Sequence, residues 1–192
     1  MNEMILQDSL ANTQLDKVPR GRYIVDPIHT RVLFGVSHFG ISTFFGEFTG
    51  VEGTLQFDPA MLREARFEVS IPVDTIYTSS RVLDEELKGI DWLDAKRFPT
   101  VTFVSEAVTR QSDGVLAVKG MLSLHGVTKE VALLATFHGS GINPVKDVYT
   151  IGFDITGRFR RSDFGVTRSL PLIGDELQLT AGIALELSRV EA

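Results

Sequence analysis

The side chains with the widest range of possible chemistry in this sequence are four histidines, His29, His38, His125 and His138. A zinc site needs three or four converging ligands, commonly with a short spacing within a pair, and no two of these histidines are closer than nine residues. His29 and His125 stand beside predicted turns, where an imidazole commonly bonds to the backbone, and His38 stands among apolar residues. We therefore predict no metal site.

Nucleophilic catalysis has no recognisable signature in the chain. The sequence contains no cysteine, and no serine stands in a Gly-x-Ser-x-Gly turn. No glycine-rich phosphate loop joins a strand to a helix either. We therefore expect no catalytic residue and no covalently held cofactor. One enzymatic alternative stays open, a hydrolase or other enzyme that acts on a hydrophobic substrate with a histidine as its base.

The charge of the chain excludes nucleic acid as a partner. Its 192 residues carry a formal net charge of −6, which gives no basic field to collect phosphates. One local positive cluster stands out, formed by Arg158, Arg160 and Arg161. A guanidinium offers a planar fork of N–H donors, so these arginines can hold a phosphate or a quinone oxygen if they face a binding site. The alternative is an exposed segment that pairs with nearby carboxylates.

Residues 32–48, which read VLFGVSHFGISTFFGEF, combine a strand-forming pattern with glycines where bulky residues would fill a core. Glycine inside a strand marks a bulge or bend, or leaves room for another group. The 13 phenylalanines of the chain are enough to line an apolar cavity, or to pack a solid core. We hypothesise a cavity, and its candidate lining residues are Phe34, Gly35, His38, Phe44, Gly46, Phe48, Phe103, Phe153 and Phe164.

These residues must be positioned by β-strands, because apolar and polar residues alternate with period two along most of the chain. The clearest run starts at Leu177 and continues through Leu179 and Ala181. Turns such as Ser112-Asp113-Gly114 separate the runs. The predicted strands cover residues 22–26, 30–38, 43–50, 52–58, 67–73, 100–109, 115–124, 127–137, 148–159 and 177–187.

Residues 79–97 interrupt this pattern. Leu83 and Leu87 have helical spacing, a serine can cap the first turn, and Gly89 can end the helix. Many antiparallel strands with one helical insertion predict an all-β barrel or sandwich. Residues 1–20 lack periodicity and are expected to form a flexible or loosely docked arm, and residues 21–192 are expected to form a single domain.

The N-terminal residues lack the basic start, the apolar core and the small-residue cleavage site of an export signal. As written, the sequence predicts a cytoplasmic protein, or a periplasmic one if this N-terminus is a processed form. No apolar run approaches the ~20 residues that a membrane-spanning helix needs.

Five motifs resemble the YceI-like family of lipid-binding proteins. In chain order they are YIVDPIHT at 23–30, FGVSHFG followed by GEF within 34–48, FPTVTF at 98–103, GMLSLHGVTK at 120–129 and RSDFG at 161–165. The resemblance implies an all-β fold, an extended antiparallel eight-stranded lipocalin-like barrel with a short helical insertion at about residues 79–97. By this resemblance, such a barrel holds a long isoprenoid or other amphiphilic chain in its lumen, often as a homodimer, and no catalysis is established as a family property.

The helical insertion is where this chain departs from the family. The family usually places a histidine in a charged cluster before an aromatic pair, whereas this chain has Arg81–Lys88 and then Asp91-Trp92-Leu93. If the insertion forms a lid, Leu83, Leu87 and Trp92 are expected to lie against the mouth of the lumen, and a different head group is expected there.

We therefore predict non-enzymatic binding, storage or transport of a long isoprenoid or similar amphiphilic lipid. A polyprenyl phosphate or the side chain of an isoprenoid quinone such as ubiquinone fits this description, and the bound polyisoprenoid would take the place of a cofactor. The resemblance also implies a homodimer. A lipid ligand implies transient contact with a membrane. Besides the hydrolase, a stress-protective barrel without bound lipid remains an alternative.

Overall fold

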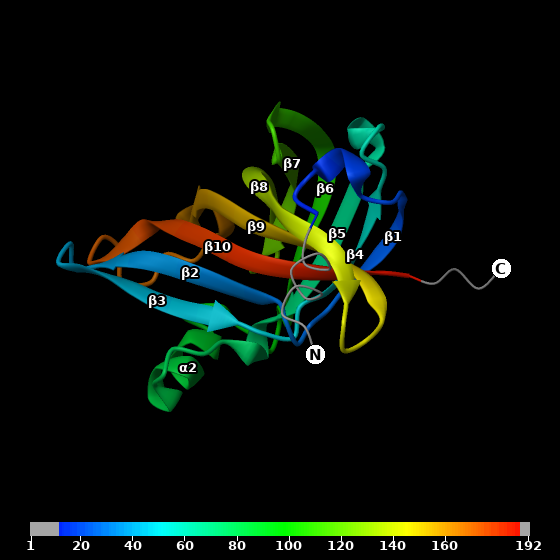
Figure 1. Ribbon diagram of the computed structural model, residues 1–192. Helices are drawn as coiled ribbons and strands as arrows, with labels where there is room; N and C mark the ends of the chain where they lie inside the picture. Colours follow the sequence, from blue (N-terminus) through cyan, green and yellow to red (C-terminus); the bar gives the residue numbers. More distant parts are fainter. Residues whose placement is uncertain (1–11, 189–192) are drawn as a thin grey trace.

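Figure 1 shows the computed structural model of the chain, which describes residues 12–188. The strands form one antiparallel sheet in the order β1-β4-β5-β6-β7-β8-β9-β10-β2-β3, and β1 also pairs with β10. This last pairing closes eight strands into a barrel, and the β2–β3 hairpin continues the sheet beyond β10. The all-β, eight-stranded lipocalin-like barrel predicted above is therefore confirmed. The strands are β1 Gly21–Val25, β2 Arg31–His38, β3 Ser42–Phe48, β4 Glu52–Phe57, β5 Arg66–Pro72, β6 Thr100–Ser112, β7 Val115–Leu124, β8 Val127–Asn143, β9 Val148–Arg160 and β10 Ile173–Leu187.

The length of β10 explains why the barrel is closed at one end and open at the other. β1 pairs with the end of β10 at Leu185–Leu187, whereas β2 pairs with its earlier part, from Ile173 to Gly182. The chain bends between β1 and β2, so the β2–β3 hairpin diverges from the ring (Figure 1). A backbone bridge between Glu47 and Tyr77 joins β3 to the segment that leads into the helical insertion.

The helical insertion contains α2, Arg81–Lys88. Its first turn is capped by Ser80, whose Oγ accepts from the N–H of Leu83 at 3.4 Å. The buried carboxylate of Asp84 accepts from the N–H and the hydroxyl of Thr78, at 2.8 and 2.6 Å, and ties the helix to the preceding segment. Short 3₁₀ turns occur at η1 Leu15–Lys17, η2 Leu62–Glu64, η3 Val73–Thr75 and η4 Arg161–Phe164. Within residues 12–188, no helix is long and apolar enough to cross a membrane.

Part of the predicted N-terminal arm is packed on the barrel. Asn12 and Ser140 of β8 exchange backbone hydrogen bonds of 2.7 and 2.9 Å. Leu15 and Val18 are buried in the core cluster. Residues 1–11 of the predicted arm lie outside the described residues.

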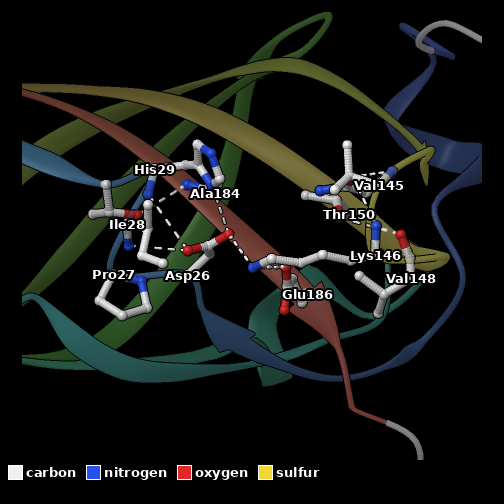
Figure 2. A network of polar contacts seen from close by, with 12 residues as sticks. Asp26, Pro27, Ile28, His29, Val145, Lys146, Val148, Thr150, Ala184 and Glu186 are labelled. Atoms are coloured by element: carbon white, nitrogen blue, oxygen red, sulfur yellow. Dashed lines mark hydrogen bonds and ion pairs between the residues drawn. The ribbon is translucent and has the colours of Figure 1, made fainter.

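A polar network fastens the closed end of the barrel (Figure 2). Its centre is Asp26, whose side chain is only 2% exposed and lies 2.7 Å from both Lys146 Nζ and His29 Nδ1. The N–H of Ile28 donates to the same carboxylate, and Lys146 also contacts Glu186 at 2.7 Å. Burial opposes ionisation of Asp26, but the hydrogen bonds from Lys146 and His29 outweigh it and lower the pKa of the carboxyl. The network thus joins the β1–β2 bend, the β8–β9 turn and β10.

Replacing this carboxylate by an amide should weaken the closed end. Asp26→Asn is expected to lower the free energy of unfolding at neutral pH by about 2 kcal/mol, because a buried charge-assisted hydrogen bond is lost. The pKa of Asp26 is lower in the folded state, so its contribution is complete above the unfolded pKa of about 3.9 and is lost as the pH falls through the folded value. Urea titrations should therefore show a constant difference between the two proteins from pH 7 to about pH 4, and a difference that shrinks as the pH falls further below about 4.

The matched control is Asp154→Asn, which removes a carboxylate 59% exposed and 3.4 Å from His138. An exposed pair of this kind contributes less than about 1 kcal/mol. A loss as large as that of Asp26→Asn, or an acid sensitivity unchanged by Asp26→Asn, would contradict the assignment of stability to the network.

Candidate functional site

An apolar cavity of about 510 Å³ occupies the open part of the barrel. This volume lies within the range of about 300–1,000 Å³ that is common for small-molecule sites. A smaller cavity of about 50 Å³ lies deeper, toward the closed end, and Phe67 and Phe103 line both. The lumen is therefore a tapering apolar pocket with its wide end between β2, β3 and α2.

Strand alternation supplies the walls of the cavity. In β2 the inward side chains are Val32, Phe34, Val36 and His38, which at ~3.3 Å per residue cover roughly 20 Å of wall. β10 places the small side chain of Ala181 on the same inner surface. The lumen is thus long and narrow, which suits a chain-like molecule better than a compact one.

Most of the predicted lining residues do line the main cavity. These are Phe34, His38, Phe44, Phe48, Leu83, Leu87, Trp92, Phe103 and Arg161. Phe153 lines the smaller cavity instead. Phe164 is buried behind the wall and packs edge-on against Phe159, a lining residue, with ring centroids 5.5 Å apart.

The two predicted glycines do not border open lumen, which corrects the expectation drawn from the sequence. Gly35 pairs with Phe45 and Gly46 pairs with Phe34 across the β2–β3 hairpin, and each glycine is covered by the ring of its partner. Phe45 is 60% exposed, so Gly35 faces outward. Gly46 faces inward, but the ring of Phe34 fills the space above it. The glycines therefore let an aromatic ring lie flat across a neighbouring strand.

The two glycines form a matched pair for mutation. A Cβ at Gly46 would meet the ring of Phe34, so Gly46→Ala is expected to push that ring into the cavity. A Cβ at Gly35 would lie 2.9 Å from the ring of Phe45, which can move into solvent. We expect Gly46→Ala to weaken binding of the apolar dye N-phenylnaphthylamine roughly threefold to tenfold and Gly35→Ala to leave it unchanged. Equal losses in a dye titration would mean that both glycines serve only the hairpin.

The polar side chains that line the cavity are concentrated near its mouth. Glu86 of α2 accepts from the indole N–H of Trp92 at 3.2 Å. The guanidinium of Arg161 lies over the Trp92 ring, 5.4 Å from its centroid. The His38 ring lies against Phe39, with centroids 4.1 Å apart and ring planes tilted by 57°. A bound molecule would therefore have its polar end among Glu86, Arg161 and His38.

Arg161 is mainly an anchor for the loop that follows η4. Its side chain is buried and donates from Nε to Gly174 O at 2.8 Å, from Nη1 to Val166 O at 2.9 Å and from Nη2 to Ile173 O at 2.9 Å. Burial lowers the pKa of Arg161, and nearby Asp175 opposes this effect. Three of the five guanidinium N–H groups are thus engaged by the backbone, and two remain for other partners.

The other two arginines of the predicted cluster lie outside the cavity. Arg158 and Arg160 are at outward positions of β9, where both are exposed. Arg158 forms an ion pair with Glu176 at 2.8 Å on that outer face. Of the three, only Arg161 reaches the lumen, because it has the parity of the inward residues Ile155 and Phe159. The expectation that all three arginines face a binding site is therefore corrected.

Three of the four histidines have partners outside the lumen. His29 contacts Asp26, His138 lies 3.4 Å from Asp154, and His125 Nδ1 lies 3.1 Å from Phe164 O. Within residues 12–188, no group of three or more His, Cys, Asp or Glu side chains is close enough to hold a metal ion.

Known proteins match this chain over most of its length. The YceI-like domain matches residues 23–185. The chain belongs to the YceI-like family. A UPF0312 protein of Pseudomonas fluorescens is 37% identical over 150 residues, which cover 74% of this chain and 75% of that protein. The family resemblance predicted from five motifs is therefore confirmed.

Solved structures share the fold of this YceI-like chain. Burkholderia cenocepacia BcnA superposes with a TM-score of 0.75 at 24% identity. The superposition covers 83% of this chain and 98% of the BcnA chain. A polyisoprenoid binding domain from Saccharophagus degradans superposes with a TM-score of 0.67 at 12% identity, over 88% of this chain and all of its own. At these identities the likeness establishes a shared YceI-like fold.

Several residues that line the YceI-like lumen were missed from the sequence. Val69 and Ile71 of β5 and Leu179 of β10 belong to runs whose alternation was recognised, so their inward parity was a usable signal. Glu86 lies three residues after Leu83 and hence on the same face of α2. Ser169 and Leu172 come from an irregular loop and carried no such signal.

Proposed function

We propose that the protein binds a long isoprenoid or similar amphiphilic lipid in its lumen and serves as a non-enzymatic carrier or store. The observation that carries this proposal is the cavity of about 510 Å³, whose walls are built from inward apolar side chains of β2, β5, β6 and β10. Membership of the YceI-like family supports it. So does the fold shared with a domain from Saccharophagus degradans that is described as polyisoprenoid-binding.

Burial of the tail provides the affinity in this proposal. Each CH₂ group removed from water contributes about 0.8 kcal/mol, so a chain of several isoprene units can offset the entropy lost on ordering it. An isoprenoid is methyl-branched and semi-rigid, and it loses less entropy than a straight acyl chain of equal length. The aromatic walls of Phe34, Phe48 and Phe103 offer a surface that such a chain can contact along its length.

The groups at the mouth favour a neutral polar head group, such as a prenol or a quinone, over a phosphate. Three of the five N–H groups of Arg161 are engaged with backbone carbonyls, and Arg158 and Arg160 face away from the lumen. The carboxylate of Glu86 lies at the mouth and would repel an anion. Burying a phosphate without a free cation is costly, whereas a hydroxyl or carbonyl needs one hydrogen-bond partner.

The rival functions receive less support from the same geometry. A hydrolase would need a histidine beside a nucleophile, but among residues 12–188 no hydrogen bond joins a histidine to a serine or threonine hydroxyl. His38 is the histidine that lines the cavity, and its ring packs on Phe39 and faces Phe44. A solid protective barrel would fill its core, whereas this barrel encloses a cavity.

Titration of the delipidated protein tests the proposal. Trp92 lines the cavity and is the only tryptophan, so its fluorescence should report loading. We expect farnesol and ubiquinone to bind, and farnesyl phosphate to bind at least roughly fivefold more weakly than farnesol. Saturable binding of farnesyl phosphate alone would overturn the neutral head group, and no binding of any prenyl compound would overturn the proposed function.

The assembly and the compartment stay predictions. Light scattering in solution tests the homodimer, because one chain has a mass of 21.2 kDa and a dimer has twice that value. Fractionation of cells that express the protein from its own gene tests the cytoplasmic against the periplasmic location.

A further inference from the structure

We infer that the open end of the barrel docks on a lipid bilayer through one defined surface. This surface, here called the rim, consists of Phe39 and Ile41 at the tip of the β2–β3 hairpin and of Arg168 and Leu172 in the loop before β10. The inference rests on the proposed function, since a lipid carrier must exchange its cargo with a membrane. It adds where the exchange takes place and which side chains make the contact.

The rim is strongly apolar and exposed. Phe39 is 52% exposed, Ile41 is 86% exposed and Leu172 is 60% exposed. The two segments are joined at the backbone, because the N–H of Phe39 donates to the carbonyl of Leu172 at 2.8 Å. Large apolar side chains gathered on one exposed surface mark an interaction site, whereas scattered ones do not.

The rim is also continuous with the lumen. Phe39 and Leu172 line the main cavity as well as being exposed, so apolar surface runs without a break from solvent into the barrel. A lipid tail that leaves the cavity at this point would therefore move directly into the acyl region of a bilayer. A protein partner would need no such continuity, and this observation favours a membrane as the occupant.

The charge of the rim suits a bilayer. Residues 37–43 and 165–173 contain no aspartate or glutamate, although the chain has 25 acidic residues. The only Lys or Arg in the two segments is Arg168, which is exposed and forms no ion pair with any residue from 12 to 188. A cation in the same loop as an exposed apolar side chain can contact lipid phosphates while the apolar groups enter the interface.

The β8–β9 turn provides a matched comparison. Val145 in this turn is 90% exposed but lies beside the charged network of Lys146, Asp26 and Glu186. The turn and the hairpin tip lie at opposite ends of the molecule in Figure 1, and β10 between them spans roughly 40 Å at ~3.3 Å per residue. Exposure alone would make the two ends equally able to bind lipid, whereas continuity with the cavity favours the hairpin tip.

Vesicle flotation with the full-length protein tests the inference. The vesicles are phosphatidylcholine alone, or phosphatidylcholine with phosphatidylglycerol, and the variants are Ile41→Asp, Arg168→Glu and Val145→Asp. Ile41 and Arg168 do not line the cavity, so these variants should bind farnesol in solution as the parent does. We expect Ile41→Asp to reduce binding to both vesicles roughly tenfold, and Arg168→Glu to reduce it roughly fivefold only where phosphatidylglycerol is present. Val145→Asp should bind as the parent does.

Each other outcome overturns the inference. The inference is overturned if the parent protein does not float with vesicles. It is also overturned if Val145→Asp and Ile41→Asp lose vesicle binding equally. A dimer that Ile41→Asp dissociates without any change in vesicle binding would assign the rim to a second copy of the chain. Farnesol binding in solution separates the two proposals: a protein that floats with vesicles but binds no prenyl compound would retain the docking surface and lose the proposed function.

Discussion

Replacing Ala181 by phenylalanine is expected to block the lumen and abolish most lipid binding. Ala181 is 3% exposed and lines the cavity between Val32 and Ile155, its register partners in β2 and β9. A benzyl group at this position would occupy space that four or five CH₂ groups of a bound chain need. At about 0.8 kcal/mol for each, the affinity for farnesol should fall several hundredfold, roughly 200-fold to 800-fold.

The same variant should remain folded, because the added ring enters a cavity and not a packed core. We expect its free energy of unfolding to stay within about 1.5 kcal/mol of the parent value. Thr180→Phe is the matched control, since Thr180 is the neighbouring residue on the outer face of β10 and is exposed. Titration of both variants with farnesol measures the difference. Parent-like affinity in Ala181→Phe would place the ligand outside the lumen.

Truncation of Arg161 is expected to give the largest loss of stability. Arg161→Ala removes three hydrogen bonds from a buried guanidinium and leaves the carbonyls of Gly174, Val166 and Ile173 without this donor. Hydrogen bonds to charged groups contribute about 1.5–3 kcal/mol each and are not additive, so we expect a loss of about 3–4 kcal/mol in the free energy of unfolding. Urea denaturation measures this loss.

Two further variants separate geometry from charge at this position. Arg161→Lys keeps the positive charge but loses the planar fork of donors, and we expect it to recover less than half of the lost stability. Arg158→Ala removes an exposed arginine that pairs with Glu176 and should cost less than about 1 kcal/mol. Full rescue by lysine, or equal losses at Arg158 and Arg161, would contradict the anchoring role of Arg161.

The strands were predictable because their signal is local. Alternation with period two follows from the pleat, and it identified the runs at 67–73 and 177–187 that now form β5 and β10. The closure of eight strands depends on the pairing of β1 with β10, which lie at opposite ends of the chain. Nothing local encodes that pairing, so the barrel itself was predicted from the resemblance.

The face that each glycine takes depends on the register of the strands as well as on the apolar–polar alternation. Apolar residues occur on both faces of residues 32–48, so alternation did not decide which glycine faces the lumen. Once Gly35 pairs with Phe45 and Gly46 with Phe34, the covering rings follow directly. Cross-strand partners are set by the hairpin turn, and a shift of one residue would reverse every face.

The arginine cluster shows the opposite case, in which a usable signal was overlooked. Arg158 and Arg160 share the parity of the exposed positions 154 and 156 in β9, which is the outward parity. Arg161 has the opposite, inward parity of the lining residues Ile155 and Phe159, and it keeps that direction although β9 ends at Arg160 and a 3₁₀ turn begins. Alternation could therefore have placed all three arginines, with Arg158 and Arg160 outward and Arg161 inward.

Native mass spectrometry of the purified protein, followed by extraction of the same sample, shows directly whether the lumen holds a prenyl lipid. We expect one prenyl lipid bound to each barrel in the parent protein and in Thr180→Phe, and its loss in Ala181→Phe. A parent protein that carries no prenyl lipid after expression in several hosts and takes none up when one is supplied, or an Ala181→Phe variant that retains the lipid in full, would contradict this expectation.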